Sequence, residues 1–209
     1  GRRRCGGGAV DGVKLLERAF GPDDEPPDVA AGGEGEQTKP VHSAQLDARD
    51  VSHGLHHLGG AARAVGVEMA LAGAGRITVV NRSRDRGQAV VDLLNDQTDA
   101  KADYAPWQGS FRIPQGTDIV IHATSVGLYP NVDAMPDIDL DSITPDMVVA
   151  DGIHNPPLTR LLKAAQDKGC KTADGLGMLV QQGVIGIRYW TGKDADPAVM
   201  RQALLDLGL

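Results

Sequence analysis

The sequence has few of the features that would indicate a secreted or membrane protein. It contains only two cysteines, Cys5 and Cys170, which are too few and too far apart to suggest a disulfide framework. No apolar run approaches the roughly 18 residues that cross a bilayer. The basic start GRRRCGGGAV lacks the apolar stretch of a signal peptide. We therefore expect a cytoplasmic protein without a membrane partner.

Aromatic residues are also scarce, and basic residues are outnumbered by acidic ones. Two Phe, two Trp and three Tyr stand beside 27 glycines, a balance typical of a loop-rich α/β chain with an aliphatic core. The net charge of −7 argues against a general affinity for nucleic acid. A chain of 209 residues can bury one good core, so one main domain is expected.

The composition divides the chain into three regions. Residues 1–20 contain VDGVKLLERAF, whose apolar side chains at about helical spacing predict one short amphipathic helix. Residues 21–57 are rich in Gly, Pro and acids and have almost no large apolar side chains. Such a composition cannot offset the entropy of ordering, so this segment is predicted to be irregular or disordered. Residues 58–209 are predicted to form the domain.

Within that domain, short apolar runs alternate with helical patterns. The predicted strands are RITVVNRS, TDIVIHATS, DMVVADGI and the short CKTADG. The predicted helices are GGAARAVGVEMALAGAG, RDRGQAVVDLLND, LTRLLKAAQDKG, LGMLVQQGVIGIRYW and DPAVMRQALLDLG, the last with Asp196 as N-cap and Pro197 in its first turn. Strands without period-two alternation, separated by helices, predict an α/β fold with a doubly wound, Rossmann-like parallel sheet.

Two stretches point to dinucleotide binding. Gly59, Gly60 and Ala61 open a helix in the way that lets backbone amides approach a pyrophosphate, although simple tight packing of the helix explains them equally well. The next strand ends in NRSRDR, where an acidic residue would hold the ribose hydroxyls of an unphosphorylated cofactor. Guanidinium groups there suit the 2′-phosphate of NADP. The alternative is a solvated basic helix start.

The stretches GGAAR, TVVNRS, ATSVGL and DGLGMLVQQGVIGIRYWTG resemble the C-terminal, NADP-binding domain of the shikimate dehydrogenase family, which includes quinate/shikimate relatives. The resemblance covers residues 59–209 in the family's order. It implies NADP-linked interconversion of 3-dehydroshikimate and shikimate in aromatic amino-acid biosynthesis. Whether quinate is also accepted, and the oligomeric state, stay open.

The resemblance also implies roles for individual residues. It assigns the phosphate turn to Gly59, Gly60 and Ala61, and the adenosine 2′-phosphate to Asn81, Arg82, Ser83 and Arg86. It places Thr124 and Ser125 along the adenine and ribose, and Gly152, Gly175 and Met178 at the nicotinamide. Gln182 matches a glutamine that binds substrate hydroxyls, and His154 stands where many members have a substrate-contacting tyrosine.

The resemblance is weaker upstream of residue 59. VDGVKLL is similar to the end of the family's NTDG segment, which would make residues 1–20 a remnant of the helix that links the two domains. Asp11 would then be the acid of the catalytic Lys-Asp pair, although a helix cap explains Asp11 equally well. The family's substrate domain and catalytic lysine are expected before this point and are not found. Alcohol oxidation needs a proton acceptor, so very low or no turnover is expected. A non-catalytic NADP-binding module, or a degenerate remnant, is the alternative.

Residues 54–57, GLHH, stand where an aliphatic strand should lead into the turn, and His57 and Leu58 occupy the family's first Gly-Ala. Either an out-of-frame stretch or a divergent insertion explains residues 21–57. His53, His56 and His57 have a spacing that can hold a metal on a helix, but Gly54 disfavours a helix. The acidic NVDAMPDIDLD lacks the glycine and glutamate of a calcium loop. No metal site is expected.

Overall fold

The computed structural model describes residues 59–208. The predicted helix within residues 1–20 and the predicted irregular segment 21–57 lie outside the described residues, as does the histidine cluster. In the described part of the chain, no helix is long and apolar enough to cross a membrane.

Helices and strands alternate along the described chain, as predicted. In chain order they are α2 (Gly59–Leu71), β1 (Arg76–Asn81), α3 (Arg84–Gln97), β2 (Lys101–Pro106), β3 (Ile119–His122), the 3-10 helix η1 (Leu140–Ser142), β4 (Val148–Asp151), α4 (Arg160–Asp167), β5 (Lys171–Ala173), α5 (Leu176–Thr191) and α6 (Pro197–Asp206). Every predicted strand and helix of this region is present. Strand β2 and helix η1 were not predicted.

The helix ends follow capping chemistry. The predicted N-cap Asp196 accepts hydrogen bonds from the backbone N–H groups of Ala198 and Val199, and Pro197 occupies the first turn of α6. Ser83 and Thr159 cap α3 and α4 in the same way, each through its hydroxyl oxygen. At its other end, α5 stops at Gly192, which adopts a left-handed conformation with a φ of 67°.

All strand pairs are parallel, which confirms the predicted α/β class. The strands form two sheets, one with the order β1-β2 and one with the order β3-β4-β5. A single doubly wound sheet was expected, but among residues 59–208 no strand joins β1 to β3. In a doubly wound sheet the strand that leads into the phosphate turn occupies the centre. Here the residues that precede α2 lie outside the described part.

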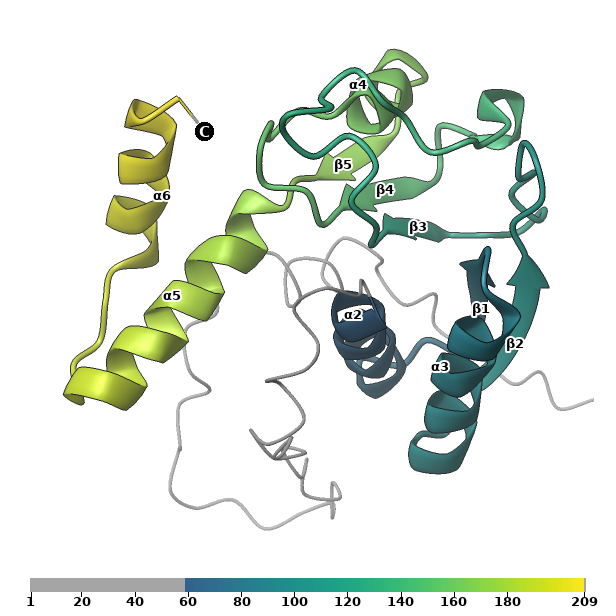
Figure 1. Ribbon diagram of the computed structural model, residues 1–209, viewed down its shortest axis with the longest axis horizontal. Coiled ribbons are helices and arrows are strands. Elements are labelled where there is room, and N and C mark those ends of the chain that lie inside the picture. Colours follow the sequence, from purple (N-terminus) through teal and green to yellow (C-terminus); the bar gives the residue numbers. More distant parts are fainter. Residues whose placement is uncertain (1–58, 209) are drawn as a thin grey trace, which may run out of the picture.

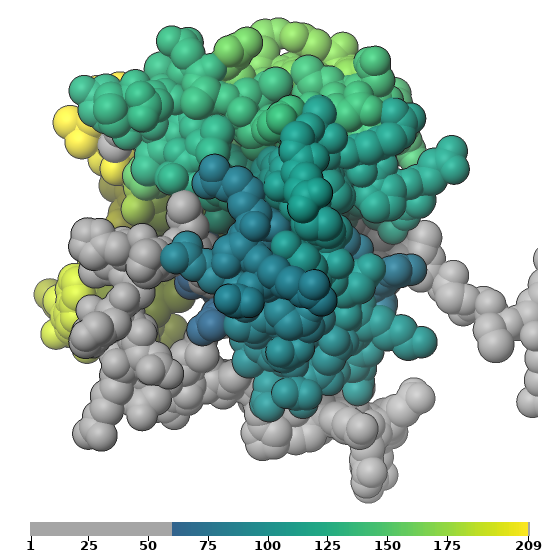
Figure 2. All heavy atoms as spheres, turned by 45° about the vertical axis from the view of Figure 1, so that its right-hand side comes forward, coloured from purple at the N-terminus to yellow at the C-terminus, as the bar shows by residue number. Residues whose placement is uncertain are grey.

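Helices cover both sheets. In Figure 1, α4 lies over β4 and β5, and α3 lies against β1 and β2. Helix α2 packs between α3 and the three-stranded sheet, while α5 runs away from the sheets with α6 beside it. Figure 2 shows the teal residues of the first sheet region and the green residues of the second meeting in one continuous surface.

The main core lies on the two faces of β4. On one face Val149 packs among side chains of α4 and of the chain before β4: Ile113, Ile143, Met147, Leu161, Leu162, Ala165 and Cys170. On the other face Val148 and Ala150 contact Val65 of α2 and Met178 of α5. The sheet is thus covered on both faces, as the strand composition predicted.

Candidate functional site

A pocket of about 120 Å³ opens where β3 and β4 end. Its walls come from four separate segments: Ala61 from the start of α2, Thr124 and Ser125 from the loop after β3, Gly152 and His154 from the loop after β4, and Met178 from α5. These six residues are all among those assigned by the family resemblance. The carboxyl ends of parallel strands are where ligands bind in open α/β sheets.

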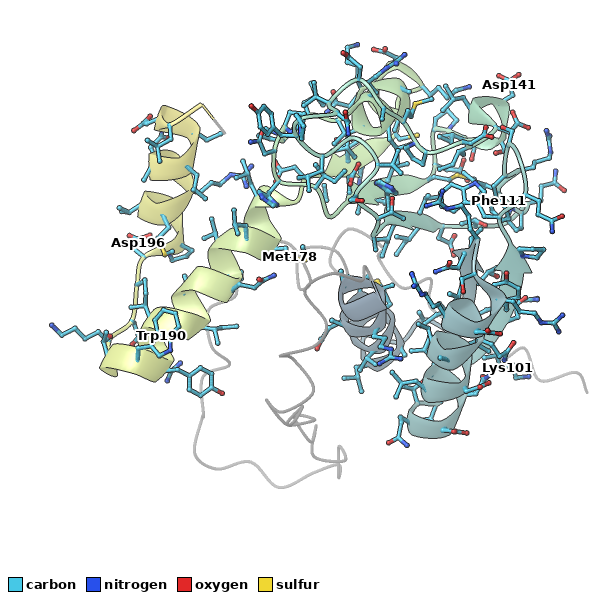
Figure 3. The ribbon with its side chains drawn as sticks, viewed as in Figure 1. Lys101, Phe111, Asp141, Met178, Trp190 and Asp196 are labelled. Carbon is cyan, nitrogen blue, oxygen red and sulfur yellow. The ribbon has the colours of Figure 1, made fainter. Side chains whose placement is uncertain are left out.

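The pocket is smaller than the roughly 300 Å³ at which ligand sites for small molecules begin. It can therefore hold one ring or sugar of a larger ligand rather than a whole dinucleotide. The wall is mainly apolar, and its polar atoms come from the loops after the two strands. Figure 3 shows Met178 in the part of α5 nearest the sheets, with Trp190 at the far end of that helix.

A buried hydrogen-bond network joins the ends of β3 and β4. The two strands pair so that His122 lies opposite Asp151. The Nδ1 atom of His122 is 2.9 Å from Oδ1 of Asp151, and its Nε2 atom is 2.5 Å from Oγ1 of Thr124. His122 is 4% exposed and Asp151 is 0% exposed. His122 therefore connects Asp151, at the end of β4, to Thr124 in the loop that lines the pocket.

Two further donors reach the Asp151 carboxylate. The hydroxyl of Thr159 donates to Oδ2 over 2.7 Å, and the backbone N–H of Ile153 donates to Oδ1 over 3.0 Å. Thr159 is also the N-cap of α4, where it accepts from the N–H of Leu162. Asp151 thus connects β3, the loop after β4 and the start of α4. In the described chain, every buried side-chain N and O atom has a hydrogen-bond partner.

Gly152 and Gly175 meet at the base of the pocket. A Cβ atom added to Gly175 would lie 2.6 Å from the backbone carbon and oxygen of Gly152 and 2.5 Å from the oxygen of Ile153. Any side chain at Gly175 would push α5 away from the loop after β4. Gly175 therefore sets how closely α5 approaches the sheet. It was assigned to the nicotinamide end, but it does not line the pocket itself.

The residues assigned to the 2′-phosphate lie at the end of β1, in the two-stranded sheet. We call Asn81, Arg82, Ser83 and Arg86 the basic cluster. Asn81 is the last residue of β1, and its Oδ1 accepts the N–H of Ser83 over 2.9 Å. The hydroxyl of Ser83 accepts the N–H of Arg86 at 3.5 Å. The side chains of Arg82 and Arg86 are exposed, and neither has an ion pair among residues 59–208. Their charges are available to a ligand at the start of α3.

Helix α2 begins at Gly59, as the phosphate turn requires. Among residues 59–208, a Cβ atom added to Gly60 would meet no atom within 4 Å, so packing within this part of the chain does not demand a glycine there. The open space next to the first N–H groups of a helix is suited to an anion. Contacts within the described residues therefore do not explain Gly60, and phosphate binding by Gly59 and Gly60 stays a prediction.

Gln182 is exposed and does not line the pocket, whereas Met178, one helical turn before it, does. The residue predicted to contact the substrate therefore lies outside the pocket, further along α5. Asp11, the predicted catalytic acid, lies outside the described residues. Sequence reasoning missed His122 and Asp151, although each is a polar residue at the end of a buried apolar run, IVIH or VVAD.

Two aspartates of the acidic stretch 131–141, between β3 and β4, form ion pairs. Arg112 contacts Asp139 at 2.6 Å, and Lys168 lies 3.7 Å from Asp141. Within residues 59–208, no group of three His, Cys, Asp or Glu side chains could hold a metal ion.

Comparison with known proteins gives one family. The profile of the shikimate 5′-dehydrogenase C-terminal domain matches residues 175–205. The shikimate dehydrogenase (NADP(+)) of Methanopyrus kandleri is 37% identical over 163 residues, which are 77% of this chain and 56% of that protein. The chain therefore spans little more than half the length of this relative.

Two solved structures also resemble this chain. The ligand-free 5-ketofructose reductase of Gluconobacter sp. strain CHM43 is 52% identical with a TM-score of 0.66, covering 72% of this chain and 54% of that one. A shikimate dehydrogenase in complex with NADP+ is 35% identical with a TM-score of 0.62, covering 72% and 52%. The chain thus contains the C-terminal domain of the shikimate dehydrogenase family.

Proposed function

We propose that this domain binds NADP as the cofactor half of an oxidoreductase that interconverts 3-dehydroshikimate and shikimate. The pocket supports the proposal most directly, because four separate segments bring six of the predicted residues together at the carboxyl ends of β3 and β4. The relatives named as NADP(+)-dependent shikimate dehydrogenases support the choice of cofactor and reaction.

In this proposal the dinucleotide runs along the carboxyl ends of both sheets. The first N–H groups of α2 at Gly59 and Gly60 face the pyrophosphate. Arg82 and Arg86 at the start of α3 bind the 2′-phosphate by charge-assisted hydrogen bonds. The nicotinamide end enters the pocket, where Met178 packs beside it. When bound, the nicotinamide supplies the hydride acceptor, while the protein orients it and excludes water from one side.

Arg82 and Arg86 provide the test of the cofactor. In calorimetric titration of the full chain, we expect NADP to bind more tightly than NAD. Replacing both residues by alanine should weaken NADP binding by about tenfold or more, since charge-assisted hydrogen bonds contribute about 1.5–3 kcal/mol each when well formed. NAD binding should change little, because NAD lacks the 2′-phosphate.

The matched control is Lys171→Ala, which removes one positive charge from the start of β5, in the three-stranded sheet. It should leave the affinity for NADP unchanged. Equal losses for NAD and NADP in the double variant, or an unchanged affinity for both, would contradict the assignment of the arginines.

Turnover is a separate question, and we propose that this chain binds the cofactor better than it catalyses. Of the lysines among residues 59–208, none lines the pocket. The expected result is tight NADP binding with little NADPH formed from shikimate. Rapid NADPH formation by the purified chain would overturn this part of the proposal.

A second candidate is the reduction of a keto sugar, favoured by the 52% identity to a 5-ketofructose reductase. We propose NADP as the cofactor in both cases, so the two candidates differ only in the substrate. NADPH oxidation with 5-ketofructose, compared with 3-dehydroshikimate at equal concentration, distinguishes them. Faster oxidation with 5-ketofructose would make this the reaction of the chain, and His154 in the pocket wall would then be the residue to substitute next.

A further inference from the structure

The network at the ends of β3 and β4 determines which hydrogens its members can donate. Thr159 accepts the N–H of Leu162 at its hydroxyl oxygen, so its single proton goes to Oδ2 of Asp151. Oδ1 of Asp151 accepts the N–H of Ile153 and faces Nδ1 of His122. Since an ionised carboxylate can only accept, Nδ1 of His122 must carry a hydrogen.

The other side of the imidazole ring faces Thr124. Nε2 lies 2.5 Å from the Thr124 hydroxyl oxygen, which also accepts the N–H of Val126 over 3.2 Å. A neutral ring is sufficient, because the Asp151 carboxylate, which also accepts from Ile153 and Thr159, takes only one proton from it. A neutral ring with its hydrogen on Nδ1 has a bare Nε2, which accepts the Thr124 proton. The remaining lone pair of Thr124 is then the polar feature that this residue offers to the pocket.

We propose that His122, held by Asp151 as the neutral Nδ1–H tautomer, makes Thr124 a hydrogen-bond acceptor for a donor group of the bound dinucleotide. A ribose hydroxyl or the carboxamide N–H of the nicotinamide has the required chemistry. His122 acts as a positioning residue, because it orients Thr124 and need not contact the ligand. The ligand half of this proposal rests on the proposed binding of NADP.

Both His122 and Thr124 line the pocket, which gives the orientation a consequence for binding. A ligand group that can only accept would meet the oxygen lone pair and would be disfavoured. A donor would complete the hydrogen bonding of the Thr124 oxygen. The network thus selects the polarity of the group bound beside Thr124, while Asp151 and Thr159 keep it rigid.

The tautomer can be read directly from the ring nitrogens of the full chain by ¹⁵N nuclear magnetic resonance. The expected spectrum for His122 has a protonated Nδ1 and an unprotonated Nε2. His154, in the same pocket wall, serves as the reference ring. A hydrogen on Nε2 of His122, whether in the other tautomer or in the doubly protonated ring, would overturn the proposal. This measurement needs no substitution and no ligand.

Substitutions of Thr124 test the acceptor. Thr124→Val keeps the shape and removes the oxygen, so NADP should bind roughly three- to tenfold more weakly. Thr124→Ser restores the hydroxyl and should restore most of the affinity. Thr144→Val, at an exposed threonine away from the pocket, is the matched control and should bind as the unchanged chain does.

The outcomes separate this proposal from the proposed function. If the unchanged chain binds NADP and Thr124→Val binds it equally well, the acceptor role is wrong. If Thr124→Ser loses as much affinity as Thr124→Val, shape rather than the hydroxyl is responsible, and the proposal is again wrong. If the unchanged chain binds no NADP, the proposed function and the ligand half fall together, and the ¹⁵N spectrum still decides the tautomer.

Discussion

In the three-stranded sheet every residue of β4 is buried, whereas in the two-stranded sheet no residue of β1 or β2 is. The three-stranded sheet is stabilised by an apolar core on both faces and by the His122–Asp151 contact. The two-stranded sheet packs against α3, whose buried residues are Gly87, Val90, Val91 and Leu94. Its other side-chain contacts, such as those of Asp103 with Arg76 and Thr78, are polar and partly exposed.

In each sheet, an aspartate of one strand contacts a nitrogen-bearing side chain of the neighbouring strand, but the two contacts differ in burial. Arg76 of β1 contacts Asp103 of β2 over 3.0 Å with side chains 76% and 46% exposed. His122 of β3 contacts Asp151 of β4 over 2.9 Å with side chains 2% and 1% exposed. An ion pair exposed to water contributes little, whereas a polar group that loses its hydrogen-bond partner in the interior is costly. The comparison teaches that the pocket is built on the more buried sheet and the basic cluster on the more exposed one.

The largest expected effect comes from Asp151→Ala. It leaves the Nδ1–H of His122, the N–H of Ile153 and the hydroxyl of Thr159 without their acceptor in the interior. We expect a loss of about 3–5 kcal/mol in the free energy of unfolding, because each buried donor left without its acceptor costs about 1–3 kcal/mol. Urea denaturation measures it.

Asp103→Ala in the other sheet is the matched comparison and should cost far less. Equal losses for the two variants would show that burial does not distinguish the sheets in the way we infer.

An intermediate effect is expected at Gly87, where α3 packs on β2. A Cβ atom there would lie 2.5 Å from two ring carbons of Tyr104, whose hydroxyl donates to the carbonyl oxygen of Asn81 over 2.9 Å. Gly87→Ala should displace the ring and cost about 1–3 kcal/mol, despite the better helix propensity of alanine. Because Asn81 is part of the basic cluster, NADP affinity should fall with it.

Gly75→Ala is the control, since a Cβ atom at Gly75 would meet no atom of the described residues within 4 Å. It should change stability by no more than about 0.5 kcal/mol. Hydrogen exchange should show faster exchange in β2 for Gly87→Ala alone. If the two alanine variants are equally stable, the contact with Tyr104 does not limit the packing of α3.

The sequence predicted the strands of the three-stranded sheet more completely than those of the two-stranded sheet. The runs IVIH and VVAD predicted β3 and β4 because buried parallel strands are continuously apolar. Strand β2, KADYAP, has only Tyr104 as a large apolar side chain, so hydrophobic pattern alone could not reveal it. The cap of α6 was predicted from Asp196, since capping is local chemistry, whereas the cap of α3 by Ser83 was not predicted.

The site shows a similar limit. The resemblance named Thr124, Gly152 and Met178, and the structure brings these residues into one pocket. The His122–Asp151 pair could not be read from the sequence, because it depends on the register between two strands 29 residues apart. The close approach of Gly175 to Gly152 likewise depends on how α5 meets the sheet.

The smallest expected effect is at Asp103 and depends on pH. The hydrogen bond from the Arg76 guanidinium holds the pKa of the Asp103 carboxyl below its usual value of 3.8, and the Thr78 hydroxyl adds to the shift against an opposing effect of burial. A lowered pKa in the folded state stabilises the protein above the usual value, and this stabilisation is lost as the pH falls through the folded-state pKa. The wild-type chain should therefore be slightly more stable than Asp103→Asn at pH 7, and the difference should shrink at about pH 3 and in high salt. Asp99→Asn, at an exposed aspartate in the same region, should show no such trend in thermal unfolding. A difference that grows on acidification, or that matches the loss in Asp151→Ala, would mean that the first sheet depends on a charge as strongly as the second, and the contrast between the two would fail.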